Sequence, residues 1–107
     1  MEERLQVRFT FDDNLMKKNG IERQDVYYTL KKNFSERGLK CVSENDVLAF
    51  EDTGQEDDYG NMWAILIGLI RSDWFIQCAA SCDFIEDGDV EDVLIQIPEL
   101  KKMLASA

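Results

Sequence analysis

Residues 62–83 read MWAILIGLI, then RSD, then WFIQCAASCD, which places two apolar runs on either side of a short polar break. Both runs are rich in β-branched and aromatic residues, and this arrangement is typical of a β-hairpin. With Ser72 and Asp73 at the turn, Leu69 faces Ile76 across the two strands. Both faces of the hairpin are apolar, so it is predicted to lie in the middle of a sheet or under a partner.

The sequence before this hairpin predicts three strands and two helices. Residues 5–11 alternate between apolar and polar side chains, which indicates a strand with one buried face. The clearest helix covers 22–37, because Val26, Leu30 and Phe34 recur at helical spacing and Gly38 follows. The remaining elements are a helical turn at 15–18 and two short strands, at 39–42 and 47–50.

The sequence after the hairpin combines a second acidic run with apolar residues at helical spacing. We expect a helix over 89–96 and a second helix that starts at Pro98, because proline suits the first turn of a helix but breaks its interior. A strand over 93–97 is the alternative, since this stretch is rich in β-branched residues.

These elements give the order β-α-β-β-β-β-α. The predicted fold class is α+β, with an antiparallel sheet of four or five strands and helices packed mainly on one face. At 107 residues the chain is expected to form a single domain, 1–107.

The net charge of −10 is unevenly distributed. Residues 1–50 hold nine acidic and nine basic side chains, whereas residues 51–107 hold thirteen acidic and three basic ones. Direct binding to nucleic acid or to an anionic membrane is therefore not expected, because both need a basic surface.

The predicted hairpin would bring most of these acids together. Its first and last residues lie at the same end, so the segments that precede and follow it leave from one edge of the sheet. Ten carboxylates are expected to gather there as a partner-binding edge: Glu51, Asp52, Glu56, Asp57, Asp58, Glu86, Asp87, Asp89, Glu91 and Asp92.

Two explanations account for such an edge. Acidic side chains keep a small protein soluble, and this requires no partner. Alternatively, a concentrated negative edge attracts a basic protein surface and speeds association at low salt. Under the second explanation the partner is a nuclease or another nucleic-acid-binding protein.

Catalytic and metal-binding motifs are absent from the sequence. The acidic runs do not match the spacing of a calcium-binding loop, and the chain has no histidine and no Cys-x-x-Cys pair for zinc. Asp83 is the one acid inside a predicted strand, which makes it a candidate, although a weak one, for general acid–base catalysis. We predict no catalytic residue, metal or cofactor, while a metal-dependent or small-ligand-binding domain stays an alternative.

The second face of the predicted hairpin suggests a homodimer. If the helices cover the other face, this one needs a cover of its own, and a symmetric dimer would supply it. The alternative function is then a small housekeeping homodimer that assembles through this face, made of Ala64, Leu66, Gly68, Ile70, Phe75 and Ala79.

The expected location is the cytoplasm. The sequence begins without the basic and apolar segments of a signal peptide, and its longest apolar run is too short to span a bilayer. Three cysteines without a regular framework suit a reducing compartment.

In size, acidity and lack of catalytic motifs, the chain resembles the small acidic inhibitors carried by phages and mobile elements, the anti-CRISPR and anti-restriction proteins. This resemblance implies a DNA-mimic protein that occupies a nucleic-acid groove or blocks a nuclease. No motif carries the resemblance, so it assigns no residues.

Overall fold

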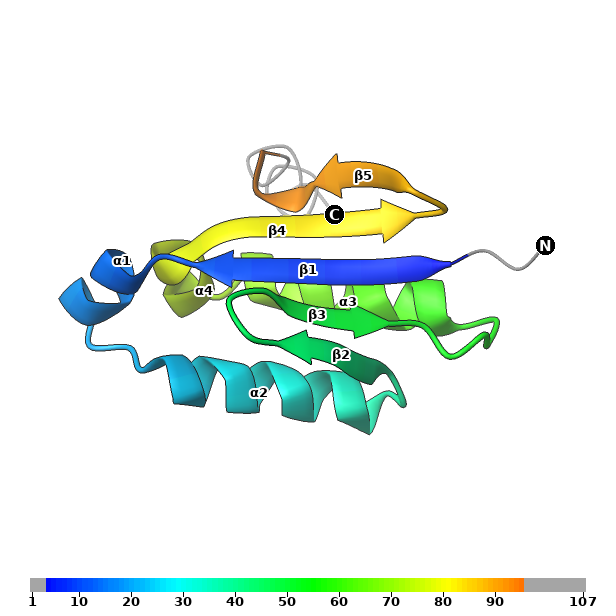
Figure 1. Ribbon diagram of the computed structural model, residues 1–107, viewed down its shortest axis with the longest axis horizontal. Helices are drawn as coiled ribbons and strands as arrows, with labels where there is room; N and C mark the ends of the chain where they lie inside the picture. The colour runs from blue at the N-terminus through cyan, green and yellow to red at the C-terminus, as the bar shows by residue number, and fades with distance from the viewer. Residues whose placement is uncertain (1–3, 96–107) are drawn as a thin grey trace.

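The structure, a computed structural model, describes residues 4–95 of the chain (Figure 1). The elements follow one another along the chain as β1 (Leu5–Phe11), α1 (Asp13–Lys18), α2 (Arg23–Glu36), β2 (Lys40–Glu44), β3 (Leu48–Glu51), α3 (Asp58–Ile70), α4 (Asp73–Cys78), β4 (Ala79–Glu86) and β5 (Asp89–Asp92).

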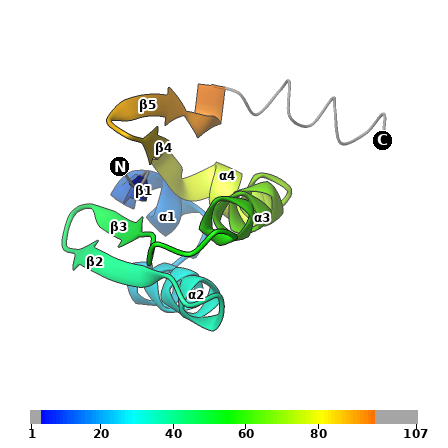
Figure 2. The ribbon, with the colours of Figure 1, turned by 90° about the vertical axis from the view of Figure 1, so that its right-hand side faces the viewer.

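The five strands form one antiparallel sheet in the order β2-β3-β1-β4-β5. Helices α2, α3 and α4 cover one face of this sheet, while α1 lies at its end (Figures 1 and 2). The predicted α+β class is confirmed, with a five-stranded antiparallel sheet and helices mainly on one face. The opposite face, which we call the open face, is covered by none of the described helices.

The core forms where β1 meets the helices. The alternation of β1 places Leu5, Val7, Phe9 and Phe11 inside and the polar residues between them on the open face. Phe9 is fully buried, and its ring contacts the rings of Phe11, Phe34, Phe50 and Phe75 at centroid distances of 5.9–6.3 Å. These contacts join β1 to β3, α2 and α4, so the central strand also organises the helical layer.

The predicted hairpin over 62–83 is wrong, because most of this stretch is helical. Residues 58–70 form α3, residues 73–78 form α4, and a strand begins only at Ala79. The buried positions of α3 recur at helical spacing: Met62, Ile65, Leu66, Leu69 and Ile70. Such a stripe turns one side of a helix toward the core, which is why the helix forms in place of a strand.

The predicted helix over 89–96 is also wrong in its first half. Residues 89–92 form β5, which pairs with β4 through a two-residue turn at Asp87 and Gly88. Both turn residues have left-handed backbone, with φ of 50° and 88°, as this kind of tight hairpin requires. Residues 93–95 are helical, which contradicts the first part of the alternative strand at 93–97; residues 96 and 97 lie outside the described residues. The helix expected from Pro98 lies outside the described residues.

The other predicted elements are confirmed, at 5–11, 15–18, 22–37, 39–42 and 47–50, with ends that shift by a few residues. Among residues 4–95, no helix has both the length and the apolar character needed to cross a membrane.

Replacing Phe9 tests the role of the central strand. Phe9→Ala should lower the free energy of unfolding by about 3–5 kcal/mol, because the cavity lies among four other aromatic rings. Tyr28→Ala is the control, since Tyr28 is 68% exposed on α2 and should change stability by less than about 0.5 kcal/mol. Urea unfolding of both variants measures the difference, and equal midpoints would contradict this account of the core.

Candidate functional site

The two acidic runs meet at the end of the sheet where β1 begins. Strand β3 pairs with β1 so that Glu51 lies opposite Gln6, and β4 pairs with β1 so that Glu86 lies opposite Leu5. Because both neighbours run antiparallel to β1, both of them end where β1 starts (Figure 1). The expected convergence is therefore present, but the two neighbours of β1 produce it, and not a hairpin over 62–83.

Two aspartates hold the first amides of β1. The Leu5 amide donates to Asp52 Oδ2 at 2.8 Å, and the Arg4 amide donates to Asp87 Oδ1 at 2.9 Å. In return, the backbone amide of Asp52 donates to the Leu5 carbonyl, and the backbone amide of Asp87 donates to the Arg4 carbonyl. These paired bonds attach the β3–α3 loop and the β4–β5 turn to two adjacent residues, Leu5 at the start of β1 and Arg4 just before it, so the two acidic segments have a fixed relation to each other.

Asp58 is buried, with 2% of its surface exposed. Its Oδ2 accepts hydrogen bonds from the backbone amides of Thr53 and Gln55, both at 2.9 Å. This carboxylate therefore organises the loop that leads into α3. It is not available to a partner, in contrast to its neighbour Asp57.

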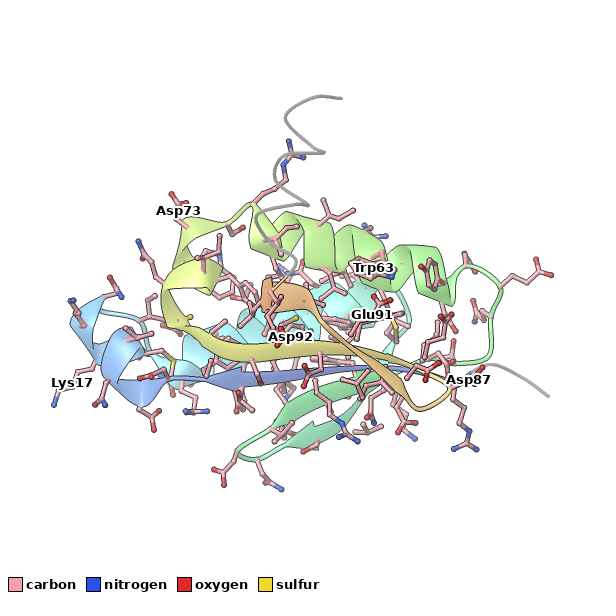
Figure 3. All side chains as sticks on the ribbon, turned by 90° about the horizontal axis from the view of Figure 1, so that it is seen from above. Lys17, Trp63, Asp73, Asp87, Glu91 and Asp92 are labelled. Atoms are coloured by element: carbon pink, nitrogen blue, oxygen red, sulfur yellow. The ribbon has the colours of Figure 1, made fainter. Side chains whose placement is uncertain are left out.

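We call the exposed and half-exposed acids at this end the acidic rim: Glu51, Asp52, Glu56, Asp57, Glu86, Asp87 and Asp89. Glu91 and Asp92 lie further along β5. Asp92 lies on the edge strand, opposite Asp83 and level with the middle of β4, whereas Asp87 marks the turn (Figure 3). Asp92 Oδ1 accepts from the Leu94 and Ile95 amides and so begins the helical turn there.

Asp83 lies on the open face, between Arg8 on β1 and Asp92 on β5. Partial burial and the charge of Asp92 raise the pKa of the Asp83 carboxyl, and Arg8 opposes this effect. The net effect is that the folded protein binds a proton at Asp83 more readily than the unfolded chain does.

The six residues of the proposed dimer face do not form one surface. Leu66, Ile70 and Phe75 are buried in the core of the chain itself, with 0–1% exposed. The hairpin pattern placed them on one face, but on helices α3 and α4 they point into the core. Ala64 and Gly68 line a hollow between α2 and α3, and Ala79 begins β4.

In the part of the chain that the structure describes, Cys78 and Cys82 are buried and no carboxylates are grouped as metal ligands. Burial raises the pKa of the Cys78 and Cys82 thiols, which disfavours the reactive thiolate. Within residues 4–95, no three histidine, cysteine, aspartate or glutamate side chains are grouped so as to hold a metal ion.

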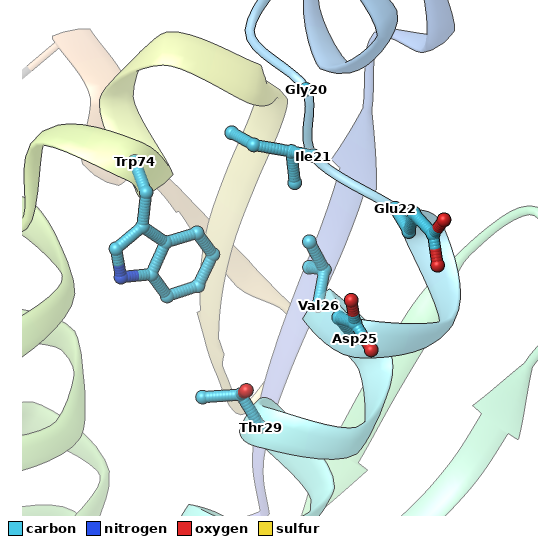
Figure 4. Close-up of a pocket in the computed structure, with 7 residues that line it drawn as sticks. All are labelled: Gly20, Ile21, Glu22, Asp25, Val26, Thr29 and Trp74. Atoms are coloured by element: carbon cyan, nitrogen blue, oxygen red, sulfur yellow. The ribbon is translucent and has the colours of Figure 1, made fainter.

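The structure also contains a cavity that the sequence did not predict. It lies beside α4 and the start of α2, at the end of the molecule opposite the β4–β5 turn (Figure 1), and Figure 4 shows it in close-up. We call it the Trp74 pocket; it has a volume of about 320 Å³ and is lined by Gly20, Ile21, Glu22, Asp25, Val26, Thr29 and Trp74. It forms where α4 lies beside the start of α2. The sequence gives no signal for this contact, because α4 was predicted as part of a strand.

No protein family model, curated protein or solved structure was found that matches this chain. Its function is therefore argued from its own residues.

Removing the Asp58 carboxylate should destabilise the fold. Asp58→Ala leaves two amides of the β3–α3 loop without an acceptor, and the expected cost is about 1–3 kcal/mol. The matched control is Asp57→Ala, which removes the same charge from an exposed position and should cost less than about 0.5 kcal/mol. Chemical denaturation distinguishes them, and equal losses would mean that Asp58 does not organise the loop.

Neutralising Asp83 should stabilise the protein at pH 7. A carboxyl whose pKa is raised by folding favours the folded state when protonated and opposes it when ionised. Asp83→Asn is therefore expected to gain less than about 1 kcal/mol at pH 7, because the site is partly exposed. The gain should disappear as the pH falls below the ordinary aspartate pKa of 3.8. Urea unfolding at several pH values tests this, and a gain independent of pH would contradict it.

Proposed function

We propose that this protein is a non-enzymatic interaction protein whose acidic rim binds a basic surface on a nucleic-acid-handling protein, as DNA-mimic and anti-CRISPR inhibitors do. The proposed location is the cytoplasm, where such a partner acts. The observation that carries the proposal is the meeting of two remote acidic runs at one end of the sheet.

Some carboxylates of the acidic rim have no polar partner within residues 4–95. Glu56, Asp57 and Asp89 are exposed, and no other residue in the described part of the chain forms a hydrogen bond or ion pair with their carboxylates. Their carboxylates remain hydrated and available. A basic partner surface would replace that hydration with opposite charge and gain both attraction and orientation.

The rim is also held in place before any partner arrives. Asp52 and Asp87 attach its two segments to β1, and Asp58 fixes the loop that carries Glu56 and Asp57. A surface that is already ordered loses little conformational entropy on binding, so more of the electrostatic attraction appears as affinity.

Reversing the exposed charges of the rim should abolish binding. The variant Glu56→Lys, Asp57→Lys, Asp89→Lys spares every carboxylate that holds the backbone and raises the net charge from −10 to −4. We expect wild-type protein to capture nucleic-acid-binding proteins from lysate at low salt and to release them when duplex DNA is added. The rim variant should capture none of them, because their basic grooves no longer meet opposite charge.

A second triple variant separates the rim from overall charge. Glu36→Lys, Asp46→Lys, Asp73→Lys also reaches −4 but changes exposed acids outside the rim. This variant should retain the DNA-displaceable partners. If both triples lose them equally, or if DNA releases nothing from the wild type, the acidic rim is not a site that mimics DNA.

A further inference from the structure

We propose that the Trp74 pocket binds a guanidinium group, carried either by an arginine side chain of a protein or by a small free guanidine. The pocket lies at the end of the molecule where α1, α4 and the start of α2 meet, far from the β4–β5 turn of the acidic rim (Figure 1). The proposal is therefore independent of the function proposed for the rim.

The floor of the pocket is apolar and fixed by the end of α1. The Ile21 amide donates to the Met16 carbonyl at 2.8 Å, and the Gly20 amide donates to the Lys17 carbonyl at 3.3 Å. This pair of bonds is a Schellman motif, which needs left-handed backbone at Gly20, where φ is 68°. Ile21 is thereby held against Val26, which is almost fully buried.

One wall of the pocket is the indole of Trp74. The side chain is partly exposed, and Figure 4 shows its ring directed toward the space above Val26 and Thr29. It packs edge-on against Phe75, with centroids 5.9 Å apart and planes at 87°. A cation that sits over the face of this indole is attracted to the ring.

The other wall is negatively charged. Asp25, on the first turn of α2, lies across the opening from Trp74, and Glu22, the N-cap residue of α2, lines the same side of the pocket with its carboxylate directed away from Trp74 (Figure 4). Arg23, the basic residue of this turn, pairs instead with Asp13 at 2.5 Å and donates to the Tyr27 hydroxyl at 2.9 Å. The two carboxylates therefore outweigh the partial positive charge of the helix start, which is about half a unit.

These walls favour a cation over a neutral ligand. A neutral group would cover the carboxylates without replacing their hydration, which costs free energy. Among organic cations, guanidinium is planar, stacks on aromatic rings and is more weakly hydrated than an ammonium group. Its N–H donors suit the acceptors that line the pocket, the Asp25 carboxylate and the Thr29 hydroxyl. The cavity is at the small end of ligand sites, which suits a single head group.

The test uses N-acetyl-L-arginine amide as the probe and its neutral isostere, N-acetyl-L-citrulline amide, as the control, both at constant ionic strength. The indole N–H signal of Trp74 in NMR spectra reports binding, while Trp63, in α3, serves as the internal reference. We expect a saturable shift of Trp74 with the arginine probe only. Methylguanidinium distinguishes the two sources of the group. If it binds as tightly as the arginine probe, the ligand is a free guanidine, and if it binds more weakly, the ligand is an arginine of a protein.

Three variants locate the binding. Asp25→Asn should weaken it about two- to fivefold, as expected for an exposed ion pair, and it leaves the core intact. Trp74→Leu, followed through the Thr29 backbone amide, should weaken it about 5- to 30-fold, which corresponds to about 1–2 kcal/mol of cation–π attraction. Glu36→Gln removes one charge elsewhere on α2 and should change nothing.

Three results would overturn the proposal. They are a citrulline shift as large as that of arginine, no saturable shift of Trp74, or equal affinity in wild type, Asp25→Asn and Trp74→Leu. The triple rim variant with Glu56, Asp57 and Asp89 reversed should bind the probe as the wild type does.

Discussion

The pairing of β1 with an antiparallel strand on each side is the constraint on which the rest of the structure depends. Because β3 and β4 both run against β1, whatever follows them emerges where β1 begins. The inward side chains of β1, with Phe9 at their centre, determine where the helices pack. Two consequences follow from one strand: a buried aromatic cluster behind the sheet and a charged rim at its end.

The elements that sequence reasoning predicted correctly are those with one polar and one apolar side. Strand β1 alternates without exception, and α2 shows buried residues only at helical spacing, ahead of Gly38 with φ of 77°. In such segments only one secondary structure hides the apolar residues and exposes the polar ones. The α+β class could be predicted from these segments, although the position of two strands could not.

Residues 62–70 were mispredicted because nearly every side chain there is apolar, which suits a buried strand and a buried helix equally. Two local signals favoured the helices: Ala64 and Gly68 fall on the exposed side, and Ser72 and Asp73 are common at helix starts. For β5, the signal was the pair Asp87-Gly88, which is typical of a tight hairpin turn. Its acidic neighbours instead suggested the start of a helix.

The candidate site was predictable only in part, since residue type does not distinguish acids that hold the backbone from acids that face water. Asp57 and Asp58 are adjacent and chemically identical, yet only Asp58 meets the amides of Thr53 and Gln55. That difference depends on the path of the loop, which the sequence does not reveal. The path of the loop also decides which carboxylates are free to bind a partner. Carboxylates that stay in water repel one another weakly, so a rim built from them costs the fold little. Those bonded to amides anchor the segments that carry the rim, and stability and partner binding therefore rest on different members of the same acidic cluster.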